Sequence, residues 1–208
     1  MKGLLLNQYY AVEKSFWWHA LIGLVAATCL MLFSDPRLQR LAGFLPLLLL
    51  STSAFEVLKH EAKSGWNKYV LTLPLKRDRV VQSHYLFFIT LLIIGLAISI
   101  LAYYLAQLLF GTESSGYIYA VLNIAGIALT MGFVIYPLTY LMGTEKAEII
   151  AMIGAGAGIG LFFLSALIYD FLPLNEDWLF SFSFMVTTLI LFIISYIVSI
   201  QVYKRKEF

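Results

Sequence analysis

The longest polar interval in the chain is EVLKHEAKSGWNKYVLTLPLKRDRVVQSH, residues 56–84, which separates two hydrophobic segments and contains six of the fourteen basic residues. Ser64 can cap the start of a helix here, and Pro74 cannot continue one. Four apolar side chains between them follow the spacing of one helix face: Trp66, Tyr69, Val70 and Leu73. We therefore predict a helix of about ten residues, about 15 Å long, on a membrane face or in a groove of a partner protein. An ordinary basic loop is the alternative.

The composition is that of a membrane protein. The chain is 61% hydrophobic and 12% charged, and its mean hydropathy is +0.86, outside the usual range of soluble domains. Cys29 is the only cysteine and lies in an apolar run. An intrachain disulfide and a cysteine-based metal site are therefore excluded.

Hydrophobic runs predict an all-α integral membrane protein that forms one domain, residues 1–208, with six transmembrane helices. Before the first span, Leu5, Tyr9, Val12 and Phe16 lie on one helix face, so we expect residues 1–15 to form an interfacial helix. The predicted spans are about 16–33, 38–55, 85–110, 117–142, 149–169 and 179–203.

Basic residues predict the orientation of these spans. With six spans and the N-terminus in the cytoplasm, only Arg37 and Arg40 of the fourteen basic residues lie outside. Cytoplasmic segments of membrane proteins are enriched in Lys and Arg. We therefore expect a multi-pass protein of the plasma membrane with both termini, and the segment 56–84, in the cytoplasm.

Motifs of catalysis are missing from the sequence. There is no G-x-x-x-x-G-K-S/T phosphate loop and no H-E-x-x-H metal motif, and the three histidines are scattered, so we expect each of them to be structural or interfacial. Neither catalytic, cofactor-binding nor metal-ligating residues are predicted, nor is binding to nucleic acid. The glycine-rich run in the fifth predicted span suits close helix packing, through the pairs Gly154/Gly158 and Gly156/Gly160.

Residues 61–85 carry a resemblance to a known family. The run Glu61-Ala-Lys-Ser-Gly-Trp66-Asn-Lys-Tyr69 continues into Leu73-Pro74, Arg77 and Val81, and it resembles the ABC-2 type permeases, the membrane subunits of ATP-binding cassette exporters. Three residues depart from that pattern: His60 replaces the first acid of a pair, Lys76 replaces a Ser or Thr, and His84 stands where a Lys is common.

The resemblance implies a coupling helix after the second span that docks on a separate ABC ATPase subunit. No stretch of this chain is polar over the ~50–250 residues that a separate domain needs, so ATP and Mg²⁺ are expected on the partner and this chain is not expected to be an enzyme. A second six-span permease, as a homodimer or heterodimer, and membrane lipid are the other implied partners. The residues carried over to ATPase coupling are Glu61, Ser64, Trp66, Tyr69, Val70, Leu73, Pro74 and Arg77.

The predicted function is the outward transport of peptides or lipophilic compounds, and the resemblance implies a mechanism of alternating access or extrusion. The sequence is similar to permeases that export phenol-soluble modulins and antimicrobial peptides. Two other classes stay open: a membrane sensor or assembly protein that docks a cytosolic partner without transport, and a secondary transporter. A secondary transporter would show intramembrane charges or broken helices in matched halves, and an adjacent gene for an ATPase would favour export.

Overall fold

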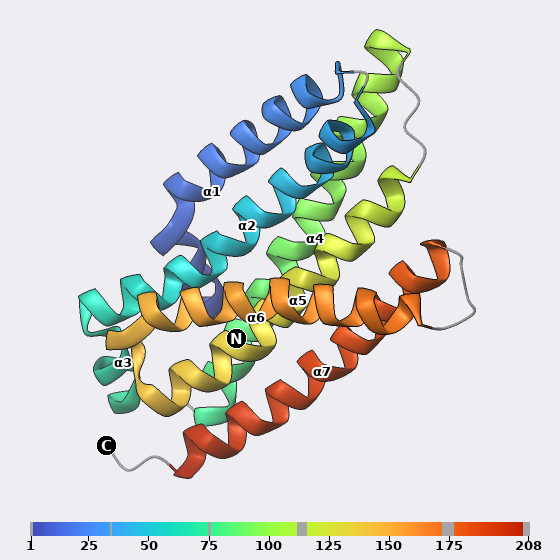
Figure 1. The fold of residues 1–208 in the computed structure, drawn as a ribbon. Coiled ribbons are helices and arrows are strands. Elements are labelled where there is room, and N and C mark those ends of the chain that lie inside the picture. The colour runs from blue at the N-terminus through green and yellow to red at the C-terminus, as the bar shows by residue number, and fades with distance from the viewer. Residues whose placement is uncertain (1, 34, 75, 112–115, 172–176, 206–208) are drawn as a thin grey trace.

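The structure is a computed structural model that describes residues 2–33, 35–74, 76–111, 116–171 and 177–205, without the side chains of residues 36, 67, 68 and 71. This part of the chain is almost entirely helical. Six long helices run back and forth along the molecule, and the segments α3 (Trp66–Tyr69), η1 (Val70–Thr72) and η2 (Thr144–Lys146) connect some of them (Figure 1). The long helices are α1 (Lys2–Leu30), α2 (Pro36–Ser64), α4 (Arg77–Phe110), α5 (Tyr117–Met142), α6 (Ala147–Asp170) and α7 (Asp177–Arg205).

Five of these helices, α2, α4, α5, α6 and α7, are long and apolar enough to cross a membrane. They contain the second to sixth predicted spans, and α5 has the predicted bounds. The first predicted span, 16–33, begins within α1 but extends three residues past its end at Leu30, and its apolar run is preceded by Glu13 and Lys14. An all-α membrane protein is therefore confirmed, and the crossing by α1 stays a prediction.

Residues 1–15 were expected to form a separate interfacial helix, but residues 2–15 continue without a break into the rest of α1. The apolar stripe on this part of α1 packs inward: Val12 is buried, and Tyr9 and Phe16 pack against the core, with their ring centroids 6.0 Å apart. Gln8 is also buried and donates a hydrogen bond of 3.0 Å to Ser83 on α4. The stripe therefore contacts protein, and its spacing alone could not distinguish a protein contact from a membrane surface.

The helices α1, α2 and α4 meet around Pro46, in the middle of α2. Pro46 has no N–H to donate, so α2 lacks one internal hydrogen bond there. Gly23 on α1 lies so close that an added Cβ would be 3.0 Å from the Cα of Pro46. Gly95 on α4 approaches from another direction, where a Cβ would be 3.2 Å from the Cα of Leu47. The absence of side chains on these two glycines allows three backbones to pack closely at the proline.

The second half of the molecule is formed by α5, α6 and α7, with α6 the least buried: 17% of its most apolar window is buried, against 56% for α5. A Cβ on Gly154 would overlap the side chain of Ile135 on α5, and a Cβ on Gly158 would lie 3.0 Å from Met131. A Cβ on Gly156 or Gly160 would meet nothing within 4 Å. Within this chain, the close approach to a neighbouring helix is at Gly154 and Gly158, and the packing role predicted for Gly156 and Gly160 stays a prediction.

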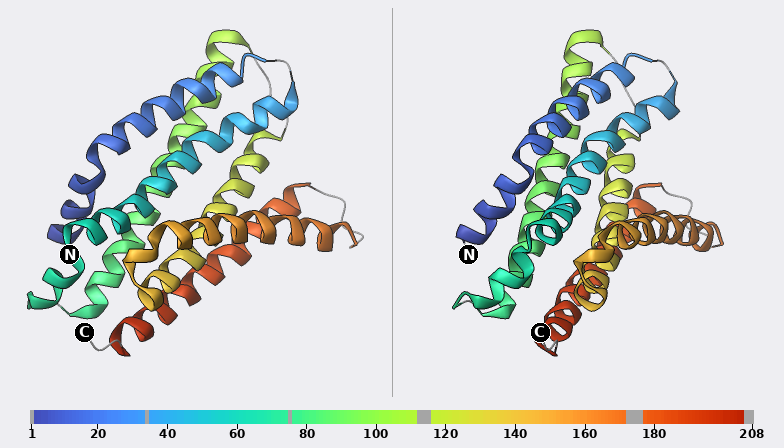
Figure 2. Two further views of the ribbon diagram at one scale, coloured as in Figure 1. Left: turned by 60° about the vertical axis from the view of Figure 1, so that its left-hand side comes forward. Right: turned by 90° about the vertical axis from the view of Figure 1, so that its left-hand side faces the viewer.

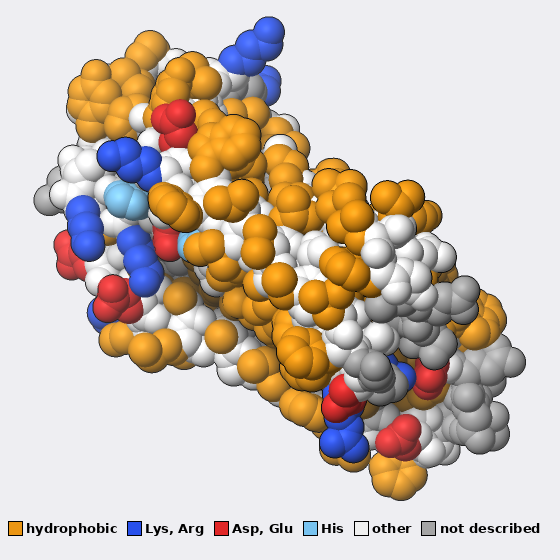
Figure 3. All heavy atoms as spheres, turned by 90° about the horizontal axis from the view of Figure 1, so that it is seen from above, with side chains coloured by type: hydrophobic (Ala, Val, Ile, Leu, Met, Phe, Trp, Pro, Cys, Tyr) orange, Lys and Arg blue, Asp and Glu red, His pale blue; other side chains and the backbone are white. Residues whose placement is uncertain are grey.

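Both termini lie at the end of the bundle that carries α3 (Figure 2). Contacts there agree: Gln8 of α1 reaches Ser83 of α4, and Lys204 of α7 forms an ion pair of 2.9 Å with Asp78 of α4. The opposite end contains the last residues of α1, α4 and α6 and the first residues of α2, α5 and α7 (Figure 1). In Figure 3, hydrophobic side chains cover the middle of the molecule and charged side chains gather toward its two ends. This distribution suits a molecule whose middle lies in lipid.

Candidate functional site

The predicted coupling segment, residues 56–84, is divided among several elements. Residues 56–64 continue α2 and residues 77–84 begin α4, so the connection between the two helices is only residues 65–76. Within this connection, the predicted helix of about ten residues is seven residues long, and it consists of α3 and the 3-10 turn η1. Figure 1 shows α3 at the lower left, beyond the end of α2.

Local backbone geometry determines where this short helix begins and ends. Gly65 has φ +71°, in the left-handed region that glycine occupies without strain, and it both ends α2 and precedes α3. Gly65 is the N-cap of α3 and no side chain caps it; Ser64, the predicted cap, is instead the last residue of α2, and its Oγ accepts from the N–H of Trp66 at 3.4 Å. Leu73 adopts an extended conformation with ψ 148° ahead of Pro74, as predicted from the proline.

The apolar stripe of the short helix faces the protein's own bundle. Val70 is only 3% exposed, and the half-buried side chains of Trp66 and Leu73 pack against the hydrophobic core. Tyr69 alone extends outward, with 56% of its surface exposed, and its ring centroid lies 5.5 Å from that of Trp66. The core thus covers Val70 fully and Trp66 and Leu73 in part, and Tyr69 is the stripe residue most available to a membrane or a partner.

A buried polar cluster lies beneath this connection. It joins Glu61 near the end of α2, His84 on α4 and Tyr140 near the end of α5, and the first two are each 4% exposed. His84 Nε2 is 3.0 Å from Glu61 Oε1, and His84 Nδ1 is 2.6 Å from the Tyr140 hydroxyl. A neutral imidazole satisfies both contacts when its Nε2–H donates to the carboxylate and its Nδ1 accepts from the tyrosine. We call these three residues the Glu61–His84–Tyr140 cluster.

The end of α7 is attached to the same region. Lys204 forms its ion pair with Asp78 in the first turn of α4, and Arg77 Nη1 donates to the backbone carbonyl of Lys204 at 3.2 Å. The rings of Tyr140 and Tyr203 are 5.2 Å apart, which joins α7 to the buried cluster. Four long helices, α2, α4, α5 and α7, are thus connected by polar or aromatic contacts within a few residues of the α3 connection.

The eight residues predicted for coupling fall into an outer and an inner group. Glu61 was predicted for ATPase coupling; it is buried and paired with His84, so its side chain faces the bundle and its part in coupling stays a prediction. The exposed members are Ser64, Tyr69, Pro74 and Arg77, and the remaining three are the stripe residues Trp66, Val70 and Leu73.

Two members of the cluster were missed as site residues. His84 was treated as a scattered histidine, although it stands where the family pattern has a cation and could have been paired with the acid 23 residues before it. For Tyr140, 56 residues further along, the sequence contained no comparable signal. The packing of α5 against α2 and α4 brings Tyr140 to the imidazole of His84. The hydropathy of α5 indicates that the helix is apolar, but not which residues it contacts.

Comparison with known protein families extends over nearly the whole chain. Residues 3–204 match the family described as "ABC-2 family transporter protein". No match to the chain was found among curated proteins. The match covers all six long helices, except for a residue at each end, and includes the α3 connection with its buried cluster. The chain therefore belongs to the ABC-2 transporter family, as a multi-pass membrane component of the kind that associates with an ABC ATPase.

Proposed function

We propose that this chain is the permease subunit of an ABC exporter, which moves peptides or lipophilic compounds outward across the plasma membrane while a separate subunit hydrolyses ATP with Mg²⁺. The observation that carries the proposal is the α3 connection: a short helix seated on the end of the bundle by buried side chains, with an aromatic residue facing out. A loop with no such packing would move independently of the bundle.

The exposed surface of the connection suits a protein partner. Tyr69 is the large apolar side chain at its tip, and the exposed basic residues Lys63, Lys76 and Arg79 lie before and after it in the chain. Tyrosine is enriched among the residues that dominate protein–protein binding energy, and positive charge at the rim favours association with an acidic surface. We assign ATPase docking to Tyr69 with support from Ser64, Pro74 and Arg77.

The buried cluster provides a route from the docking surface to the transmembrane helices. A displacement of α3 by the ATPase acts on the end of α2 directly, since only Gly65 separates them. Glu61 on α2 is hydrogen-bonded to His84 on α4, and His84 is in turn hydrogen-bonded to Tyr140 on α5. The ends of three helices therefore shift together, as required for the alternating access that we propose.

A second permease copy completes the proposed transporter. The poorly buried helix α6 and its open face at Gly156 and Gly160 leave room for contact with another subunit. The preference for peptides or lipophilic compounds as cargo comes from the sequence resemblance and from the apolar character of the helices.

Tyr69→Ala tests the docking assignment. We expect the variant to insert and fold normally, because the side chain is exposed, and to bind its ATPase about thirtyfold more weakly, the effect of losing ~2 kcal/mol at an interface. The full chain is purified from native membranes, and co-purified ATP hydrolysis is measured per mole of permease, with the ATPase identified by its G-x-x-x-x-G-K-S/T loop.

The matched control is Tyr104→Ala, which removes an exposed tyrosine at the far end of α4 and should leave ATPase association unchanged. Equal ATPase recovery from Tyr69→Ala and Tyr104→Ala would contradict docking at α3. Trp66→Ala is a poorer test, since Trp66 also packs against the core and its loss perturbs the bundle.

A further inference from the structure

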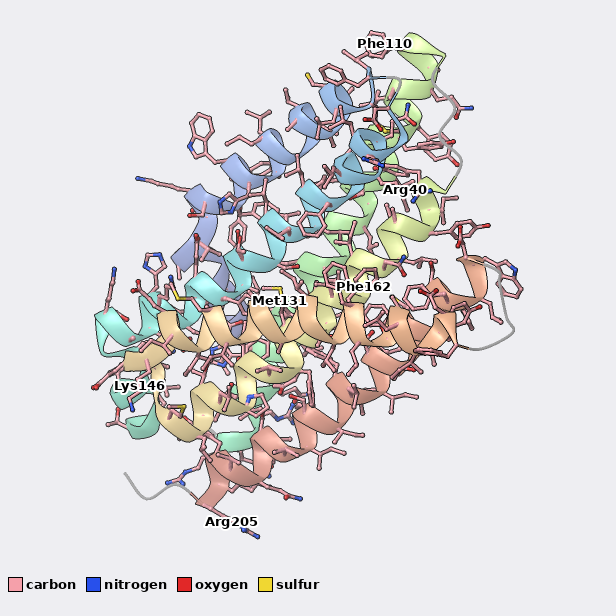
Figure 4. All side chains as sticks on the ribbon, viewed as in Figure 1. Arg40, Phe110, Met131, Lys146, Phe162 and Arg205 are labelled. Atoms are coloured by element: carbon pink, nitrogen blue, oxygen red, sulfur yellow. The ribbon has the colours of Figure 1, made fainter. Side chains whose placement is uncertain are left out.

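A cavity of about 440 Å³ lies at the end of the bundle opposite α3, between α2, α5, α6 and α7. Its volume is within the range of ligand pockets, roughly 300–1,000 Å³. Arg37 and Arg40 on α2 line its outer part, and Phe44, Phe162 and Phe180 are among the apolar residues that line the rest. In Figure 4, Arg40 is labelled on α2 toward that end of the molecule and Phe162 on the middle of α6.

Arg37 and Arg40 are the two cationic residues among the described residues that line the cavity. Arg37 and Arg40 are three residues apart on α2, so they lie on the same helix face. No ion pair joins either guanidinium to a carboxylate within the described part of the chain, where Lys59, His84 and Lys204 form the ion pairs. Guanidinium groups bind carboxylates through paired hydrogen bonds, so two of them at one cavity favour an anionic ligand.

The charge at the cavity sets the charge of the ligand. Asp177, at the start of α7, also lines it and is the one acidic residue among the described lining residues. Two arginines and one aspartate leave a single positive charge, which a monoanion balances. A dianion would leave an excess of negative charge near Asp177.

A third polar group lies deeper in the cavity. Asn123 on α5 lines the cavity, and its Oδ1 is buried without a hydrogen-bond partner in the described structure. A buried acceptor without a donor is destabilising, and a ligand N–H or O–H at this point would satisfy it. The aromatic rings provide the apolar surface around this amide.

We propose that this cavity binds a carboxylate amphiphile, a monoanionic carboxylate attached to an apolar body. The carboxylate lies between Arg37 and Arg40, and the apolar body lies against Phe44, Phe162 and Phe180. A fatty acid and the C-terminal end of an apolar peptide both have this chemistry. The proposal concerns binding alone, so it does not depend on the exporter function or on the docking of an ATPase.

The first test compares head groups on the unmodified protein. The full chain in nanodiscs of zwitterionic phosphatidylcholine is incubated with tritiated dodecanoate, at a pH where the acid is ionised, and unlabelled compounds compete for it. We expect dodecanoate to compete at least tenfold better than dodecanol, and dodecyltrimethylammonium to compete least. Equal competition by dodecanol, or better competition by the ammonium compound, overturns the proposal.

The second test changes the charges at the cavity. Arg37→Gln combined with Arg40→Gln should weaken dodecanoate binding about tenfold, the effect of losing charge-assisted hydrogen bonds. Asp177→Asn should strengthen it, because the repelling carboxylate is gone. The matched control is Arg205→Gln, which makes the same change at the opposite end of the molecule (Figure 4) and should leave binding unchanged. Unchanged binding in the double arginine variant, or weaker binding in Asp177→Asn, contradicts the charge argument.

The third test separates the two sources of the carboxylate. A capped tri-leucine acid and the corresponding amide compete for the same site in wild type and in Asn123→Leu. Better competition by the peptide acid than by dodecanoate, lost in Asn123→Leu, assigns the site to a peptide end, whose N–H reaches Asn123. Better competition by dodecanoate, retained in Asn123→Leu, assigns it to a fatty acid. Equal competition by the peptide acid and its amide, together with none by dodecanoate, overturns the proposal.

Discussion

At the scale of single residues, the Glu61–His84–Tyr140 cluster joins α2, α4 and α5 at the end of the bundle that carries α3. Each member is nearly inaccessible to solvent, and each hydrogen bond joins two different helices. Buried polar groups are tolerated only while all of them remain hydrogen-bonded, because a buried group that loses its partner has given up its hydrogen bonds to water without replacement. The three side chains therefore act as a unit.

A double-mutant cycle at positions 61 and 84 tests this unit. Glu61→Leu leaves the His84 N–H without its acceptor and should destabilise the protein by about 1–3 kcal/mol. His84→Leu should cost a similar amount, because both Glu61 and Tyr140 lose a partner. The variant with both leucines should be more stable than the sum of the single effects predicts, since removing both polar partners avoids an unpaired buried group. The thermal unfolding midpoint in detergent measures all three.

His60→Leu is the control for this cycle, because His60 is exposed on the same turn of α2 and should change the midpoint little. Additive effects of the two leucines would show that Glu61 and His84 contribute independently, and the cluster would then have no role in joining α2 to α4.

At the scale of elements, α6 packs on α5 through one face and leaves the other open. Gly154 and Gly158 lie on the packed face, and Gly156 and Gly160 lie on the open one. The two pairs have the same small-xxx-small spacing, yet only one of them is in contact with a neighbouring helix of this chain.

Gly154→Leu should disrupt the packing of α6 on α5, because the added side chain would overlap Ile135. Overpacking of this kind costs typically about 1–3 kcal/mol, and here α6 has little other burial to hold it. Gly156→Leu is the matched control, with open space around it. Yield and unfolding midpoint in detergent should fall for Gly154→Leu and change little for Gly156→Leu. Unchanged values for Gly154→Leu would mean that α6 is packed differently from this structure, and a loss in Gly156→Leu as well would indicate the contact with a second subunit proposed for that face.

The elements also show how far the sequence predicts this fold. Apolar runs locate α5 to the residue and α6 and α7 to within two residues at each end, because in those helices the apolar run and the regular hydrogen bonding end together. Apolar runs do not locate the C-terminal end of α2, because the apolar run ends near Phe55 but the helix continues to Ser64 through charged residues. Hydropathy reports burial in lipid, whereas helix ends depend on local geometry such as the left-handed Gly65.

The candidate site was predictable only where it depends on local sequence. Pro74 and Ser64 fixed the ends of the short helix at nearly the right residues. The spacing of Trp66, Val70 and Leu73 indicated that they share a helix face, but it did not indicate which surface that face contacts. Contacts between helices far apart in the sequence, such as those of His84 with Tyr140, arise from the packing of the whole bundle.

At the scale of the whole molecule, six long helices place both chain ends beside α3. A path that begins and ends at one end of a bundle crosses it an even number of times. The helix α1 runs from the α3 end to the turn before Asp35, so its course supports the predicted crossing although part of it is polar. The proposed topology thus has six crossings, with Arg37 and Arg40 outside.

Cysteine labelling in intact cells tests this topology, in a background in which Cys29 is replaced by serine. We expect an impermeant reagent to label Phe171→Cys, which is highly exposed at the far end, and not to label Lys2→Cys or Ser64→Cys. Permeabilised cells provide the control, since all three positions are exposed and should then react. Labelling of both Lys2→Cys and Phe171→Cys in intact cells would show that the chain crosses the membrane five times. Labelling of Ser64→Cys would show that the orientation is the reverse of the proposed one.

The close packing at Pro46 has a mechanical consequence. A proline in a long helix is ordinarily the point at which the helix bends, because it removes a backbone hydrogen bond. In α2, however, Gly23 and Gly95 bring two neighbouring backbones against that point, so bending would force the three helices apart. The helix α2 should therefore behave as a stiff rod, and a push on its α3 end would be transmitted along its length to Arg37 and Arg40 instead of being absorbed midway.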